Sequence, residues 1–158
     1  NVKKQLGRQI KNAYAQTGKT RYLRIKKQSL AIILQIEAAQ TQVVACYTQK
    51  GGAASTDATI QVLSTEASGT LTEEITPIRT SIEADILNVN ERVGSIQDLE
   101  KALAVATTPE EVETISNSLQ DIIDNATNAD SQKKQVEGIR DDIGEQAKLD
   151  LATCQALP

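Results

Sequence analysis

The stretch YLRIKKQSLAIILQIEAAQTQVVAC, residues 22–46, decides the fold. Its apolar and small residues recur three and four positions apart, which places them on one face of a helix. Such a seam is typical of helices that pack side by side. Its members are Ile25, Ser29, Ile32, Ile36, Ala39, Val43 and Cys46. Gly51 and Gly52 follow a last turn that carries Lys50, and they predict where this helix ends.

Helical spacing also runs before and after this stretch. Residues 2–13 predict a shorter helix that is joined to the first one at Gly18. The polar cluster at residues 55–57 predicts the cap of a second long helix. Further along, Pro77 either kinks that helix or opens a new one with Thr76 as its cap.

Two further signals divide the second half of the chain. Residues 94–95, Gly-Ser, predict a stop followed by a cap. The clearest start signal is TTPEEVETI, in which Thr108 is the cap, Pro109 takes the first helical position and Glu111 lies three residues past the cap. Acidic residues in that first turn also complement the helix dipole.

The last predicted helix begins at Asp130 or Ser131 and carries its apolar face as far as Cys154. No strand-like alternation of convincing length appears in the sequence. We therefore predict an all-α fold, an elongated helical bundle of three to five helices with heptad-like aliphatic seams. The length of 158 residues favours a single domain over 1–158, with 1–20 as a basic N-terminal helical arm.

Composition argues against the usual chemistry of enzymes. The chain has no His, Phe, Trp or Met, three Tyr and two Cys. Without His it lacks the side chain best suited to proton transfer near neutral pH, and it has too few ligands for an ordinary zinc site. We expect no catalytic residues, no cofactor and no metal. There is also no run of about 18 apolar residues, so we expect no transmembrane segment.

The stretch AYAQTGKT, residues 13–20, fits the loose pattern of a phosphate-binding loop. Such a loop needs a hydrophobic strand before it, whereas the preceding residues are charged and helix-periodic. We interpret it as a helix junction and expect no nucleotide. Residues 124–135 resemble a calcium loop only in their Asp and Asn content, because Ala129 and Gln135 replace the required Gly and Glu.

Adjacent carboxylates occur at 73–74, 110–111 and 141–142. Neighbouring side chains on a helix point about 100° apart, so neither member of a pair is held against the other. The pair at 110–111 is explained by helix capping. The others are interpreted as solvated helix faces rather than catalytic pairs.

Charge is distributed very unevenly along the chain. Residues 1–36 contain nine basic residues and no acidic one, so they carry +9 while the remainder carries −13. The basic residues, which we predict to face a partner, are Lys3, Lys4, Arg8, Lys11, Lys19, Arg21, Arg24, Lys26 and Lys27. Nucleic acid, an anionic membrane and the acidic face of another copy all fit such a segment. A solvated basic helix face without a partner is the plainer interpretation.

Each cysteine lies near the C-terminal end of a long predicted helix. If these helices run parallel, Cys46 and Cys154 meet at the same end of the bundle. Closing that 108-residue separation would stabilise the fold by roughly 4–5 kcal/mol on the chain-entropy model. The alternative is two buried thiols that act as small hydrophobic side chains. We favour the disulfide, and with it an oxidising compartment.

Two features near the N-terminus point to opposite compartments. Asn1 is not an ordinary product of initiator-Met removal, which suggests signal-peptide cleavage or a trimmed chain. The basic N-terminal segment would oppose export if a membrane anchor preceded it. We expect an extracytoplasmic location: secreted, periplasmic or at the cell surface.

Three functions remain open. The first is a non-enzymatic secreted or cell-envelope helical bundle that acts through protein–protein contacts, such as an assembly or surface-structure subunit. In that case the partner could be another copy, with the basic arm on the acidic body. The second is an extracytoplasmic four-helix sensor or ligand-binding domain. The third is a nucleic-acid-binding coat or architectural protein, which is disfavoured because the segment has only Tyr14 and Tyr22 for base stacking.

Overall fold

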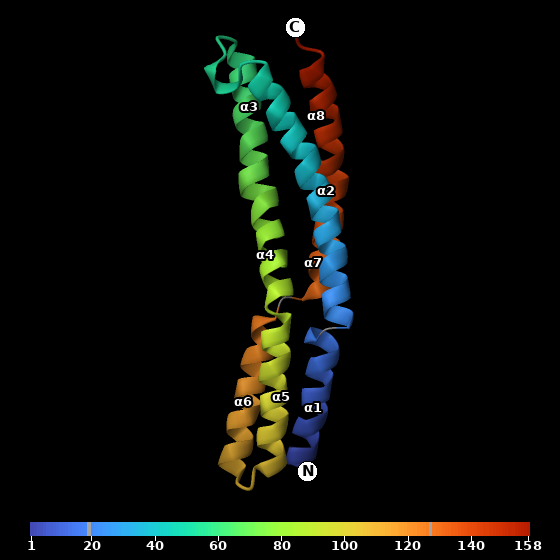
Figure 1. The fold of residues 1–158 in the computed structure, drawn as a ribbon, viewed down its shortest axis with the longest axis vertical. Helices are drawn as coiled ribbons and strands as arrows, with labels where there is room; N and C mark the ends of the chain where they lie inside the picture. Colours follow the sequence, from blue (N-terminus) through green and yellow to red (C-terminus); the bar gives the residue numbers. More distant parts are fainter. Residues whose placement is uncertain (19, 127) are drawn as a thin grey trace. The chain divides into compact units, whose positions relative to one another are not determined.

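The computed structural model describes residues 1–18, 20–126 and 128–158, and every regular element in these ranges is helical (Figure 1). The α-helices are α1 (Val2–Thr17), α2 (Arg21–Gln49), α3 (Ala58–Gly69), α4 (Thr76–Leu87), α5 (Val89–Val105), α6 (Pro109–Asn125), α7 (Ala129–Ile139) and α8 (Glu145–Gln155). A 3-10 turn, η1 (Gly52–Ala54), follows α2. Two π-helical segments, η2 (Thr70–Ile75) and η3 (Arg140–Gly144), join α3 to α4 and α7 to α8. The prediction of an all-α helical bundle is confirmed.

The chain forms two compact units. Asn1–Lys27 with Ala84–Gln132 make up the first, and Gln28–Glu83 with Lys133–Pro158 make up the second. Each unit is therefore built from segments that are far apart in the sequence. The expectation of a single domain over 1–158 stays a prediction.

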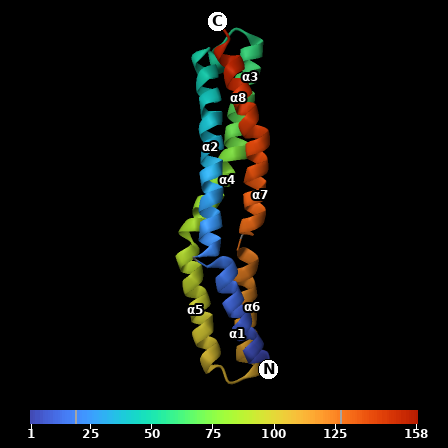
Figure 2. The same ribbon diagram turned by 90° about the vertical axis from the view of Figure 1, so that its right-hand side faces the viewer.

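In the first unit, α1, α5 and α6 pack against one another (Figures 1 and 2). The buried side chains are Leu6, Ile10, Ala13, Ile96, Leu103, Ala106, Ile115 and Leu119. On α1 they recur at spacings of four and three residues, so one face of this helix is apolar and faces the core. Helix α1 is thus packed into the unit by one face, and its basic residues Lys4, Arg8 and Lys11 are exposed on the other side.

In the second unit, α2, α3 and α8 share a core around a disulfide. Cys46 of α2 is bonded to Cys154 of α8, with their Cα atoms 6.2 Å apart. The C-terminal ends of the two helices lie at the same end of this unit (Figures 1 and 2), so the predicted parallel arrangement and the disulfide are both confirmed. At that end the Lys50 Nζ donates a hydrogen bond of 2.6 Å to the Leu157 carbonyl.

The predicted end of α2 and two predicted helix starts are confirmed. Gly51 has a φ of +109°, a backbone conformation that a residue with a Cβ rarely adopts, so the chain reverses there. The Asp57 side chain accepts a hydrogen bond of 2.9 Å from the Thr59 N–H at the start of α3. At the start of α6, Thr108 Oγ1 accepts one of 3.2 Å from the Glu111 N–H.

The helix does not restart at Pro77. The Thr76 N–H donates to the Leu71 carbonyl five residues back, which is the π-helical pattern, and α4 continues directly from it. Proline lacks an N–H, and its ring clashes with the carbonyl four residues earlier in a regular α-helix. The wider turns of η2 just before Pro77 relieve that conflict. Thr76 is not a cap, since its hydroxyl bonds a Glu37 carboxylate oxygen at 3.2 Å.

Two other boundaries also differ from the prediction. Helix α5 runs through residues 94–95 without a stop, and the Ser95 hydroxyl donates to the Glu91 carbonyl one turn earlier. Helix α7 begins at Ala129, so neither predicted cap is correct. Instead, Asn128 Oδ1 accepts a hydrogen bond of 3.3 Å from the Ser131 N–H.

The buried seam of α2 also differs from the predicted one. Ile33 and Gln40 are buried, whereas Ile32 and Ala39 are half-buried. The buried positions of α2 are Tyr22, Ile25, Lys26, Ser29, Ile33, Ile36, Gln40, Val43, Cys46 and Tyr47. They keep the spacing of three and four residues but admit two long polar side chains. A prediction of the buried seam from aliphatic residues alone does not include Lys26 and Gln40.

Candidate functional site: an acidic groove and a basic helix face

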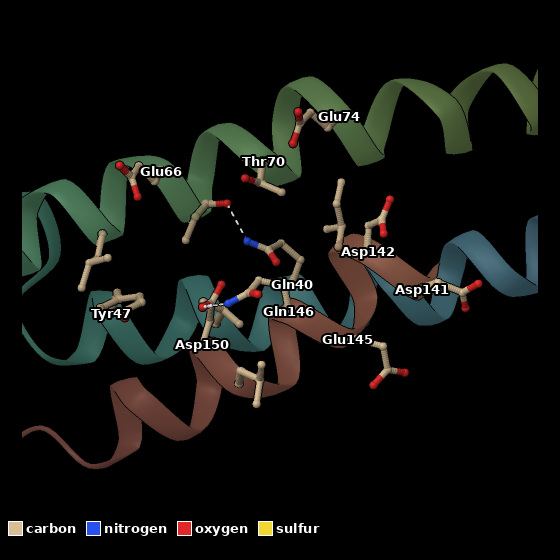
Figure 3. Close-up of a pocket in the computed structure, with 15 residues that line it drawn as sticks. Gln40, Tyr47, Glu66, Thr70, Glu74, Asp141, Asp142, Glu145, Gln146 and Asp150 are labelled. Carbon is tan, nitrogen blue, oxygen red and sulfur yellow. Dashed lines mark hydrogen bonds between the residues drawn. The ribbon is translucent and has the colours of Figure 1, made fainter. Parts of the chain in front are cut away.

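A groove of about 620 Å³ lies in the second unit, between α2, the α3–η2 helix and the η3–α8 helix (Figure 3). Its floor is apolar and includes the buried side chains of Val43, Tyr47 and Ala67. Gln40 crosses beneath it, where Nε2 donates a hydrogen bond of 3.0 Å to the Ala67 carbonyl. That bond satisfies a buried amide and ties α2 to α3 under the groove.

Carboxylates occupy both sides of this groove. They are Glu66, Glu74, Asp141, Asp142, Glu145 and Asp150, and no basic side chain is among the lining residues that the structure describes. The first two come from α3 and η2, and the other four from η3 and α8 (Figure 3). Among residues 1–18, 20–126 and 128–158, no group of three such side chains converges as a metal site would require. The groove is a broad acidic surface rather than a focused cluster.

Both π-helical segments contribute to this groove. Segment η2 supplies Thr70 and Glu74, and η3 supplies Asp141, Asp142 and Ile143. A π turn shifts the side chains that follow it around the helix, and such segments are common at functional sites. The neighbours Glu73 and Glu74 illustrate the selection, because both are exposed but only Glu74 lines the groove. From the sequence alone, 73–74 and 141–142 are interpreted as separate solvated faces, whereas the fold brings Glu74, Asp141 and Asp142 to one groove.

The groove contains one phenol among its described lining residues, that of Tyr47. Burial raises the pKa of Tyr47 above its ordinary value, and the negative charge of Asp150 raises it further. Asp150 in turn accepts a hydrogen bond of 2.9 Å from Gln146 Nε2 (Figure 3). The local field is therefore negative, and it favours cations over anions as ligands.

The opposite charge is concentrated on α1. Lys4, Arg8 and Lys11 are exposed, and their spacing of four and three residues places them in one stripe on the side of the helix away from its buried face. None of the three forms an ion pair with a residue that the structure describes. We call this set the α1 stripe.

The other predicted basic residues have different surroundings. Arg24 and Lys27 are exposed on α2. Arg21 pairs with Asp130 at 2.8 Å, and both side chains are about half exposed, so the bond contributes little to stability. Lys3 donates a hydrogen bond of 2.9 Å to the Ala106 carbonyl just past the end of α5. The predicted Lys19 lies outside the described residues.

Lys26 is not at the surface, which corrects its predicted role in facing a partner. Its side chain has no exposure to solvent. Nζ donates a hydrogen bond of 2.7 Å to Asp85 Oδ2 and another of 2.5 Å to Gln132 Oε1. Burial lowers the pKa of Lys26, while the hydrogen bond and the charge of Asp85 oppose that shift. Lys26 occupies the inner face of α2 because these two acceptors replace water.

Lys26 and Arg92 both make cation–π contacts with the ring of Tyr22. The Tyr22 ring is buried, with Lys26 Nζ 5.3 Å and the Arg92 guanidinium carbon 4.5 Å from its centroid. Arg92 also donates a hydrogen bond of 3.1 Å to the Thr17 carbonyl at the end of α1. Every partner is within the first unit, and the arrangement fixes the junction between α1 and α2. Only the pairing of a tyrosine with a lysine four residues later hinted at it.

The same junction contains the stretch that resembles a phosphate-binding loop. Helix α1 ends at Thr17 and α2 begins at Arg21, so the interpretation as a helix junction is confirmed, with Lys19 outside the described residues. Position 18 requires glycine, because a Cβ there would clash with the carbonyl oxygen of Tyr14. No hydrophobic strand precedes it among the described residues.

Among the described residues, one helical stretch is long and apolar enough to cross a membrane, by length and composition alone. Within Val2–Ala54, a window of 18 residues has a mean hydropathy of 1.3, and a third of it is buried. Core helices and signal sequences pass the same test. The expectation that the chain has no transmembrane segment stays a prediction.

The acidic groove and the α1 stripe thus carry charge of opposite sign. The chain matches no protein-family model, no curated protein and no solved structure.

Proposed function

We propose that this chain is a non-enzymatic helical module that works outside the cytoplasm through protein–protein contacts, including contacts with copies of itself. The observation that carries the proposal is the separation of charge. The second unit has six basic and eleven acidic residues, a net charge of −5. The α1 stripe in the first unit presents three cations without an anionic partner among the described residues. Surfaces of opposite sign attract and orient one another during encounter.

A salt series tests self-association. Light scattering of the purified chain should give a larger mass at low ionic strength and a smaller one as salt rises, because exposed charges are screened over about 8 Å at physiological ionic strength. A chain that remains monomeric at every concentration and at low salt would overturn the proposal.

The proposed location rests on the disulfide between Cys46 and Cys154. Disulfides persist in oxidising compartments and are rare in the reducing cytosol. Alkylation of the protein in its native source, without reductant, followed by intact-mass measurement, tests this point. Two alkylated cysteines would place the protein in a reducing compartment and contradict the proposed location.

A further inference from the structure

We propose that the acidic groove is the binding site for the α1 stripe of a second copy of this chain. The inference rests on the proposed function and names the two surfaces that meet. The groove supplies carboxylates on two sides and an apolar floor. The occupant supplies Lys4, Arg8 and Lys11 from one helix face.

Charge complementarity is the first argument. Six carboxylates line the groove without a basic side chain among the described lining residues, so like charges face one another across it. Four of them, Glu66, Glu74, Asp142 and Asp150, form no ion pair with a residue that the structure describes. A cationic helix placed between the two sides would relieve that repulsion and supply the missing counter-charge.

The spacing along the helices is the second argument. At 1.5 Å per residue, Lys4 and Lys11 are separated by about 10 Å along α1. On one side of the groove Glu66 and Glu74 are eight residues apart in α3 and η2, and on the other Asp142 and Asp150 are eight residues apart in η3 and α8. Each pair is therefore separated by at most about 12 Å along its helix axis. One helix with cations at these intervals matches both sides at once.

The apolar floor is the third argument. Leu149 is 63% exposed at the groove, a large hydrophobic side chain that nothing in the described structure covers. The stems of Lys and Arg are aliphatic and cover such surface while their charged ends reach nearby carboxylates. Ala15 follows Lys11 on the same stripe of α1 and is exposed, which leaves room for the close approach of another helix.

Charge reversal tests the pairing of these surfaces. The groove variant is Glu74→Lys with Asp142→Lys. Its matched control is Glu73→Lys with Asp121→Lys, which makes the same change in net charge at two exposed acids outside the groove. The stripe variant is Lys4→Glu with Lys11→Glu, and the swapped chain carries both reversals and keeps the wild-type net charge.

Sedimentation velocity at low salt, after nuclease treatment, measures the association of each chain. We expect the groove and stripe variants to associate at least about tenfold more weakly than wild type, the control to stay within about threefold, and the swapped chain to regain association. Circular dichroism confirms that each variant retains its helices. Loss in the control equal to that in the groove variant would overturn the inference, because net charge alone would then explain it.

The remaining outcomes separate the inference from the proposed function. If wild type associates and the groove variant associates equally well, the groove does not bind the α1 stripe, while self-association stands. If wild type does not associate at any salt concentration, both fail. If association disappears with nuclease treatment, nucleic acid was bridging the α1 stripes, and the contact between copies is wrong.

Discussion

The Nζ atom of Lys26 lies 2.7 Å from Asp85 Oδ2, and the lysine side chain is fully buried while the aspartate side chain is 20% exposed. A buried charge costs free energy to desolvate, and its partner repays that cost only when the pair is intact. The pair is therefore a sensitive point of the first unit, because removing either member leaves a polar group without its counterpart.

Replacing Lys26 with Met should lower the free energy of unfolding by about 2 kcal/mol or more, because Asp85 and the buried Gln132 both lose their donor. Denaturant unfolding followed by circular dichroism measures it. Lys27→Met, at the exposed neighbouring position, is the control and should change stability by less than about 0.5 kcal/mol. Equal effects of the two substitutions would show that the buried pair contributes nothing.

The same lysine predicts a dependence on alkaline pH. Burial is the main cause that lowers the pKa of Lys26 in the folded chain below its ordinary value of 10.5. As pH rises between the folded pKa and 10.5, the folded chain has lost the proton and the unfolded chain still binds it. The free energy of unfolding contributed by Lys26 therefore rises with pH in that window. The Lys26→Met chain should lack this rise.

Tyrosines limit the range of that measurement. Burial raises the pKa of Tyr22 above 10.0, so the folded chain holds its phenol proton longer than the unfolded chain does. The contribution of this group to stability falls as pH rises above about 10. Denaturant titrations from neutral pH to just below pH 10 isolate the lysine. A difference between wild type and Lys26→Met that does not change with pH would contradict the assignment.

Removing the disulfide should have the largest effect of any single covalent change. The double substitution Cys46→Ala with Cys154→Ala opens a 108-residue separation, and the chain-entropy model gives a loss of roughly 4–5 kcal/mol. Guanidinium unfolding of wild type with and without reductant, beside the double variant, measures it. Reductant should destabilise the wild type and leave the variant unchanged. A loss below about 1 kcal/mol would mean that the unfolded chain is not constrained by this bond.

Two glycines should respond in opposite directions to alanine. Gly51 has a φ of +109°, so Gly51→Ala should cost about 1–2 kcal/mol in backbone strain. Gly94 lies inside α5, and a Cβ there would have no neighbour within 4 Å. Gly94→Ala should therefore stabilise the fold by about 0.5–1 kcal/mol. Thermal unfolding of both variants checks the pair, and a stabilising Gly51→Ala would refute the proposed helix end.

Local signals were sufficient for much of this fold. The cap at Thr108, the reversal at Gly51 and the partnership of Cys46 with Cys154 all follow from chemistry within a few residues or from helix direction. Gly94 predicts a helix stop that the structure does not have. A single glycine inside a helix costs only about 1 kcal/mol, and the burial of Ile96 and other α5 side chains offsets that cost.

The candidate site was less accessible to sequence reasoning. The basic run of the sequence predicts that Lys26 faces a partner at the surface, and a charged residue is rarely buried. Its acceptors are 59 and 106 residues away in the chain, so no local pattern indicates them. The groove depends on the two π-helical segments η2 and η3. In the sequence, Pro77 just after η2 is the one local sign of either segment. Glu74 and Asp142 line the same groove from two helical segments that no local pattern in the sequence relates.

The bond between Cys46 and Cys154 also changes the covalent connectivity of the chain. It turns residues 46–154 into a covalent loop, and this loop contains all of Ala84–Gln132. A protease that cuts once anywhere within the loop would leave both fragments attached. Such a nicked molecule would gain only the mass of a water and would fall into two pieces when a reducing agent is added.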